Sequence, residues 1–148
     1  MSTEDYVDQL IARYPAVFQG QEPAAGCSVP EGWRQIVEDL CRDFTQVLQC
    51  SPGHRLQMLQ VKEKFGALRV YFSLDGDQDL VADLQDLDGH IHLVQKAEGP
   101  AVMDELRALV DGARRRSQQA CQKCGEPGSQ RNRRGWLAVL CDRHSTSE

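Results

Sequence analysis

The chain has 148 residues, 41% of them hydrophobic, and a formal net charge of −5 at pH 7. This length suits one compact domain with a small appendage, and the acidic balance argues against a protein that binds nucleic acids through its overall charge. No stretch approaches the roughly 20 apolar residues of a membrane helix, and the acidic N-terminus lacks the basic and apolar regions of a secretory signal. We therefore expect a cytoplasmic protein that does not act at a membrane.

Helical periodicity dominates the first part of the chain. Ser2 is placed to cap a helix that runs through Tyr14, before Pro15 ends it. After a loop rich in Gly and Pro, the apolar residues between 31 and 50 recur at the i, i+3, i+4, i+7 spacing of a helix packed on one side. These residues are Trp33, Ile36, Val37, Leu40, Cys41, Phe44, Val47 and Leu48.

The period changes to two between Arg55 and Leu74, which is typical of strands. Two alternating runs flank residues 62–66, where a glycine allows a turn, so we expect an antiparallel hairpin with one face against the long helix. Residues 90–94 are a candidate third strand.

A third helix, again amphipathic, is expected from about Ala101 to Gln118. Its C-terminal end carries Arg114, Arg115 and Arg116, which complement the helix dipole. Together these elements predict an α+β fold, with helices packed on a small antiparallel sheet, over residues 1–119.

Two close pairs of metal ligands mark the C-terminal part. Cys121 and Cys124 are followed, after 16 residues, by Cys141 and His144. At this spacing each pair binds a zinc ion from one tight turn while the insert returns as a hairpin. Gly125 supports this interpretation, because such a knuckle usually requires a positive φ.

Three thiolates and one imidazole fill all four positions of a tetrahedral zinc ion and leave none for water. We therefore expect structural Zn²⁺ at this site, without catalysis at the metal. Residues 120–148 are predicted to form a zinc-ribbon-like module that packs on the domain of residues 1–119 as one compact unit.

Charge is divided unevenly along the chain. Six aspartates and no Lys or Arg lie between residues 75 and 88, whereas seven arginines and Lys123 lie between residues 114 and 143. Although either run alone is also typical of a solvated surface, we expect the acidic run to bind a basic protein partner with electrostatic steering. Its candidate contact residues are Asp75, Asp77, Asp79, Asp83, Asp86 and Asp88. The alternative is a nucleic-acid-binding regulator that uses the arginines and the ring of Trp136.

Other chemical signals are weaker. A calcium loop starting at Asp75 would need glycine where Leu80 stands and glutamate where Asp86 stands. His90 and His92 would share one face of a strand, an arrangement that suits either a metal or ordinary surface histidines. The sequence has no nucleophile elbow, phosphate loop or metalloprotease motif, so we expect no enzymatic activity, with an enzyme of unrecognised type as an alternative. The cysteines expected to be reduced thiols outside the metal site are Cys27, Cys41 and Cys50.

Three stretches occur together in a way that resembles a known family. They are Gly32–Ile36 at the start of the long helix, Val61–Phe72 on the hairpin, and Cys121–His144 with Arg134-Gly135-Trp136 inside it. The combination is similar to a family of small, largely uncharacterised bacterial and phage proteins with a C-terminal zinc-ribbon-like module. Some members are encoded beside secreted toxins. The resemblance therefore implies an immunity protein, or antitoxin, that neutralises a cognate toxin.

Overall fold

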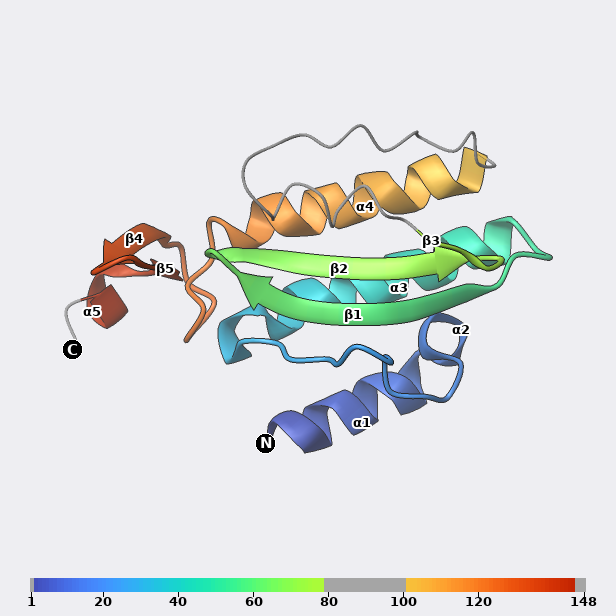
Figure 1. Cartoon of the computed structure of the whole chain (residues 1–148), viewed down its shortest axis with the longest axis horizontal. Coiled ribbons are helices and arrows are strands. Elements are labelled where there is room, and N and C mark those ends of the chain that lie inside the picture. Colours follow the sequence, from blue (N-terminus) through green and yellow to red (C-terminus); the bar gives the residue numbers. More distant parts are fainter. Residues whose placement is uncertain (1, 79–100, 146–148) are drawn as a thin grey trace.

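The computed structural model describes residues 2–78 and 101–145, which form an α+β fold with two small antiparallel sheets. Figure 1 shows a long hairpin covered by helices, with a short ribbon at one end. The elements are α1 (Thr3–Arg13), α2 (Pro15–Phe18), the 3₁₀ turn η1 (Glu31–Trp33), α3 (Arg34–Cys50), β1 (Leu56–Lys64), β2 (Ala67–Leu74), β3 (Asp77–Gln78), α4 (Ala101–Ser117), β4 (Ser129–Arg133), β5 (Trp136–Leu140) and α5 (Asp142–Ser145). The predicted α+β class is confirmed, and the candidate strand at residues 90–94 lies outside the described residues.

The first helix begins as its capping residue predicts. The hydroxyl of Ser2 accepts a hydrogen bond from the amide of Asp5 at 3.1 Å, which satisfies one of the free donors of the first turn. The helix ends at Arg13, and Pro15 then starts the short α2 at a position where its missing N–H is no loss.

The second predicted helix begins differently from the expected single helix over residues 31–50. Its first residues form η1, in which the amide of Trp33 donates to the carbonyl of Pro30 at 2.9 Å, and the α-helix starts only at Arg34. The amide of Gly32 donates instead to the carbonyl of Gln122, in the C-terminal part of the chain, at 2.8 Å. The tight first turn is therefore set by a tertiary contact as well as by the local sequence.

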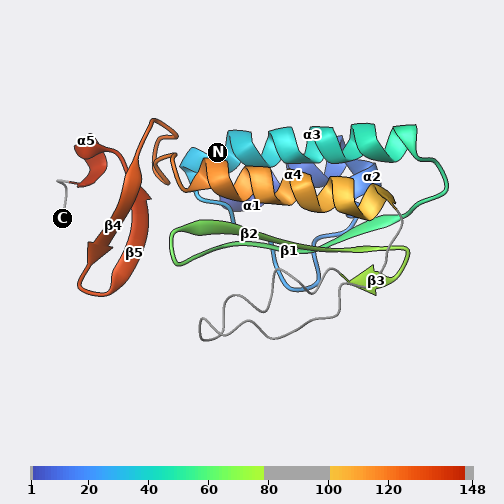
Figure 2. The ribbon, with the colours of Figure 1, turned by 90° about the horizontal axis from the view of Figure 1, so that it is seen from above.

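The main sheet is built on the β1–β2 hairpin, whose register runs from Leu56 opposite Leu74 to Lys64 opposite Ala67. Helices α3 and α4 lie side by side over one face of this hairpin (Figure 2). Alternate residues of β2 enter the core between them, and the rings of Phe44 and Phe72 meet edge to face at 5.6 Å. The burial of one strand face against two amphipathic helices confirms the predicted packing.

The loop before η1 protects the outer side of β1. The amide of Ser28 donates to the carbonyl of Val61, and the amide of Val61 donates to Gly26, at 2.9 and 3.1 Å. Ala25 bonds to Leu59 at the irregularity in β1, so the loop satisfies backbone groups of a strand that would otherwise be an open edge. Within the described part of the chain, no helix combines the length and the apolar character needed to cross a membrane.

Candidate metal centre

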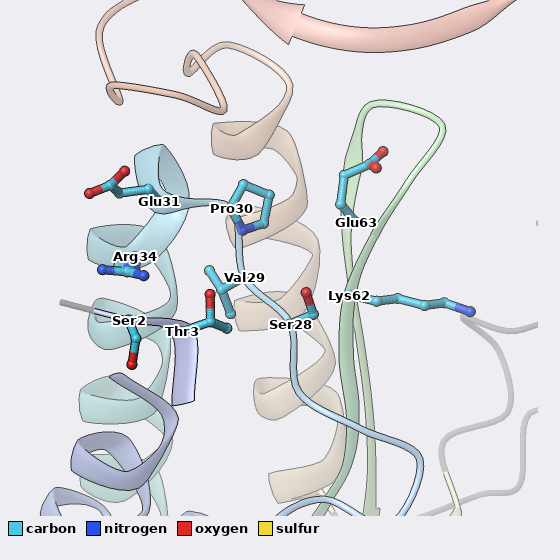
Figure 3. A pocket seen from close by; sticks show the side chains of 9 residues that line it. All are labelled: Ser2, Thr3, Ser28, Val29, Pro30, Glu31, Arg34, Lys62 and Glu63. Carbon is cyan, nitrogen blue, oxygen red and sulfur yellow. The ribbon is translucent and has the colours of Figure 1, made fainter. Parts of the chain in front are cut away.

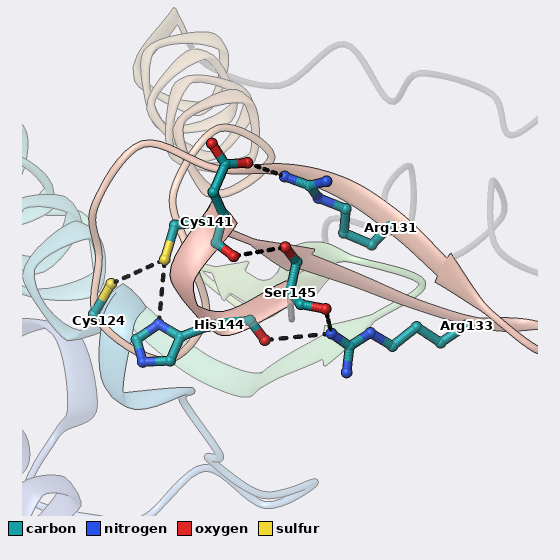
Figure 4. Close-up of polar contacts among 7 residues, drawn as sticks. Cys124, Arg131, Arg133, Cys141, His144 and Ser145 are labelled. Atoms are coloured by element: carbon teal, nitrogen blue, oxygen red, sulfur yellow. Dashed lines mark hydrogen bonds and ion pairs between the residues drawn. The ribbon is translucent and has the colours of Figure 1, made fainter. Parts of the chain in front are cut away.

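The four predicted ligands come together at the end of the chain. The ligand atoms of Cys121, Cys124, Cys141 and His144 all lie within 4.8 Å of one another. Cys141 Sγ lies 3.2 Å from Nδ1 of His144 and 3.8 Å from Cys124 Sγ (Figure 4). Cys121 Sγ lies 3.4 Å from the same nitrogen of His144. A cluster of this composition and size can hold a metal ion.

Each pair of ligands is presented by a short hydrogen-bonded turn. After α4, the amide of Gly125 donates to the carbonyl of Cys121 at 2.8 Å, and Gly125 adopts the predicted positive φ, at 82°. After β5, the amide of Ser145 donates to the carbonyl of Cys141 at 2.9 Å, which closes the single turn α5 and turns His144 toward the thiols. The hairpin β4–β5 between these turns has the predicted position, and its register joins Ser129 to Leu140.

The surroundings of Cys121 favour its thiolate form. Burial acts to raise the pKa of Cys121, but backbone amide donors of Cys141, Lys123 and Cys124, together with His144, lower it to about 6. For Cys124 the amide of Glu126 acts to lower the pKa, but desolvation and the neighbouring thiols of Cys121 and Cys141 raise it. Repulsion between adjacent thiolates therefore opposes full deprotonation until a cation compensates it.

Gly32 fixes the position of the first knuckle against the core. A Cβ added at Gly32 would lie 2.6 Å from the nitrogen of Gly125 and 2.8 Å from the carbonyl carbon of Gln122, and would overlap the carbonyl oxygen of Cys121 even more closely. Only glycine permits this backbone approach. The sequence reasoning treated Gly32 only as part of a family motif and missed this role.

Trp33 also holds the first knuckle of the metal site against the core. Its side chain is fully buried, and its indole Nε1 donates to the carbonyl of Ala120 at 2.8 Å. On the ribbon side, the side-chain oxygen of Gln122 accepts from the amide of Val139 at 2.6 Å, and Val139 belongs to the main hydrophobic core. The ribbon of residues 120–145 is thus joined to the rest of the molecule by backbone hydrogen bonds, one indole and one buried valine. The exact domain boundary at residue 119 stays a prediction.

Several arginines of the basic run make internal contacts. Arg131 pairs with Asp142 at 2.8 Å, and the guanidinium of Arg133 donates to the carbonyls of His144 and Ser145 (Figure 4). Arg116, at the end of α4, pairs with Asp39 of α3 at 3.1 Å. Arg131 and Arg133 therefore support the turn that carries His144, and Arg116 joins the two core helices.

The acidic candidates divide into two groups. Asp75 accepts from the amide of Arg55 at 2.7 Å and contacts Nδ1 of His54 at 2.7 Å, so it joins the turn after β2 to the start of β1. The Arg55 amide and the His54 side chain hold the pKa of Asp75 below its usual range. Asp77 lies in β3, opposite Leu74. The remaining candidates lie outside the described residues, as do both strand histidines: Asp79, Asp83, Asp86, Asp88, His90 and His92.

An open cleft of about 670 Å³ lies between the N-terminal end of α1, the loop before η1 and strand β1 (Figure 3). Three of its charged residues make contacts within the fold. The Arg34 guanidinium stacks over the ring of Tyr6 at 4.7 Å, Lys62 approaches the ring of Tyr71 at 5.6 Å, and Glu63 accepts from the Gly66 amide at 2.8 Å. This mixture of charges does not converge on a catalytic arrangement.

The three other cysteines are free thiols, as expected. Cys41, within α3, is fully buried in the core, whereas Cys50 is exposed at the end of that helix. Comparisons of the chain with protein-family models, with curated proteins and with solved structures find no match.

Proposed function

We propose that the chain is a non-enzymatic protein-binding protein whose C-terminal ribbon is held by one structural zinc ion. The observation that carries this proposal is the cluster of three cysteines and one histidine, with ligand atoms within 4.8 Å of one another. In a tetrahedral zinc site, bonds of about 2.3 Å to sulfur and 2.0 Å to nitrogen separate two thiolates by about 3.8 Å and a thiolate from an imidazole by about 3.5 Å. The distances of 3.8, 3.4 and 3.2 Å between ligand atoms are close to these values.

The ligand types favour zinc and a structural role. Soft thiolates select zinc over magnesium or calcium, and four protein ligands leave no open position at which the ion would activate water. When bound, zinc would supply rigidity to a ribbon whose own apolar cluster is small: Cys121, Ala138, Leu140 and Cys141.

Two exposed aromatic side chains support protein binding. Among the described residues, Phe65 and Trp136 are the large hydrophobic residues that remain exposed, at 58% and 71%. Each lies at a two-residue hairpin turn, Phe65 within the turn after β1 and Trp136 directly after the turn that follows β4. Exposed aromatic rings are typical anchors of protein interfaces.

The backbone of Phe65 strengthens this argument. Phe65 has φ at 54°, in the left-handed region that a bulky residue adopts only with strain of about 1 kcal/mol or more. Asparagine would suit this turn better, because both residues between Lys64 and Ala67 have positive φ, as in a type I′ turn. The Lys64 ammonium lies over the Phe65 ring at 5.6 Å, but the ring is more than half exposed. A strained aromatic residue at this position gains little from the fold, which points to a role in binding.

The most concrete form of the proposal is an immunity protein. The run of aspartates between residues 75 and 88 would steer the chain toward a basic cleft in a toxin, while the aromatic rings would provide contact area. Nucleic-acid binding is less favoured, because Arg116, Arg131 and Arg133 already pair within the molecule.

Two measurements test the proposal separately. Elemental analysis of the freshly purified protein should give about one zinc ion per chain, and a metal-free ribbon with separated thiols would contradict the structural site. The purified protein should also form a complex with the product of its neighbouring gene. Phe65→Asn and Trp136→Ala should weaken this complex by about 1–4 kcal/mol each.

Charge reversal at Asp77, Asp79 and Asp83 should mainly slow association, and more so at low salt. An unchanged association rate would remove the proposed role of these aspartates. Tight, strongly salt-dependent binding to DNA or RNA would favour the alternative function instead.

A further inference from the structure

The four ligands differ in their access to solvent. Cys121 and Cys141 are buried, with exposures of 0% and 7%, whereas Cys124 is half-buried. Cys124 also lines an open cleft of about 520 Å³ at the joint between the ribbon and the core. The cleft is also lined by residues of α3 and by residues at and just after the end of α4, among them Gln35 and Gln119. Cys124 is therefore the cysteine ligand with the most access to a small molecule in solution.

The thiol of Cys141 lies close to that of Cys124. Cys141 Sγ is 3.8 Å from Cys124 Sγ, and a disulfide requires about 2.05 Å between the sulfurs. The two cysteines belong to different turns, one after α4 and the other after β5, so a bond between them would link the two ends of the ribbon. To form the bond, the sulfurs must approach by about 1.8 Å through side-chain rotation or movement of either turn.

We propose that Cys124 is an oxidation site through which a peroxide expels the metal, an inference that rests on the zinc site proposed above. The Cys124 thiolate attacks one peroxide oxygen, so that an S–O bond forms, the O–O bond breaks and the leaving oxygen takes a proton to become water or an alcohol. The Cys141 thiolate then attacks the sulfur of the resulting sulfenic acid. The S–S bond forms, and hydroxide leaves and is protonated to water.

These two steps oxidise two thiolates by two electrons in total and reduce one peroxide. The ion then keeps only Cys121 and His144 as ligands, which is too few for a structural site, and it is released. Trp136 lies on the ribbon that the metal holds, so oxidation couples the state of the thiols to a proposed partner-binding residue.

The experiment uses the zinc-loaded full-length chain and hydrogen peroxide. Zinc release is followed with a coloured chelator, and disulfides are located by peptide mapping without reduction. Roughly one zinc ion should be released for each Cys124–Cys141 disulfide. In a short exposure with a trapping reagent for sulfenic acids, the first labelled residue should be Cys124. Cys50, an exposed thiol outside the metal site, is the internal control for the sulfenic acid that solvent exposure alone produces in the same sample.

A matched pair of variants tests the route. Gln35→Trp narrows the cleft and should slow zinc release by a bulky organic hydroperoxide more than release by hydrogen peroxide. Gln9→Trp places the same ring on the exposed side of α1, away from the cleft, and should leave both rates unchanged.

Different results would contradict the oxidation site at Cys124 and the structural zinc site. A chain that neither contains nor takes up zinc would overturn both. A zinc-loaded chain that keeps its metal in peroxide, that forms a Cys121–Cys124 disulfide, or in which Cys121 or Cys141 is labelled first would overturn the oxidation site and leave the structural zinc site standing.

Discussion

The substitution Gly32→Ala tests how the metal-binding ribbon is attached to the core. The added Cβ would overlap three backbone atoms of the first knuckle, those of Cys121, Gln122 and Gly125. No flexible side chain is available to move aside, so the knuckle and η1 must separate by roughly an ångström or more. This separation breaks two hydrogen bonds, from the Gly32 amide to Gln122 and from the Trp33 indole to Ala120, both 2.8 Å long.

The loss in free energy of unfolding can be estimated from these broken contacts. Two hydrogen bonds contribute about 1 kcal/mol each, and forced overpacking costs about 1–3 kcal/mol, which gives a destabilisation of about 3–5 kcal/mol. This is a large part of the 5–15 kcal/mol that stabilises a typical domain. The four ligands all lie within the ribbon, so zinc stoichiometry should stay the same while the ribbon separates from the core.

The assay is urea unfolding of the zinc-loaded chain, with tryptophan fluorescence as the signal. Trp33 is fully buried at the joint and Trp136 is exposed on the ribbon, so the spectral change on unfolding is dominated by Trp33. Gly112→Ala is the matched control. Gly112 lies within α4 with no atom near the added Cβ, and the change should stabilise the protein by up to about 1 kcal/mol through helix propensity. If Gly32→Ala unfolds within about 0.5 kcal/mol of the wild type, the close-approach argument is wrong.

Four further predictions concern single groups. Removal of the metal with a chelator should abolish the protection of backbone amides from hydrogen exchange in β4 and β5, because the ribbon has only a small apolar cluster of its own. The amides of α3 and of the β1–β2 hairpin should stay protected. An equal loss of protection in all of these elements would contradict the prediction. Trp33→Phe leaves the Ala120 carbonyl without its donor and should destabilise the fold by about 1–3 kcal/mol in the same unfolding assay. Phe65→Asn should leave the free energy of unfolding unchanged or raise it by up to about 1 kcal/mol, because asparagine adopts a positive φ with less strain than phenylalanine. A clear loss of stability in thermal unfolding would show that the ring supports the fold. The pKa of Asp75 is depressed, so its stabilising contacts are present above the unfolded pKa of about 3.9 and are lost as the pH falls through the lower folded value. Asp75→Asn should therefore make stability less dependent on pH in that acidic range, as measured by melting at a series of pH values, and an unchanged pH profile would remove this role.

Local patterns in the sequence were sufficient to predict most of the secondary structure and the metal ligands. The i, i+3, i+4 spacing placed α3 and α4, alternation placed β1 and β2, and the spacing of three cysteines and a histidine placed the metal cluster. These signals act over one turn, one strand or one short hairpin, where the geometry of the backbone alone links residue spacing to position. For the same reason the family resemblance and the acidic partner surface stay predictions, since neither is a question of local geometry.

The attachment of the ribbon was decided only by the tertiary structure. Trp33 and Ala120 are separated by 87 positions along the chain, and no periodic pattern reports that an indole and a carbonyl at that separation meet. The same holds for Gly32 under the first knuckle and for the Arg116–Asp39 pair between two helices. Such contacts depend on how complete elements pack around a shared core, so their geometry is a property of the whole fold rather than of any one segment.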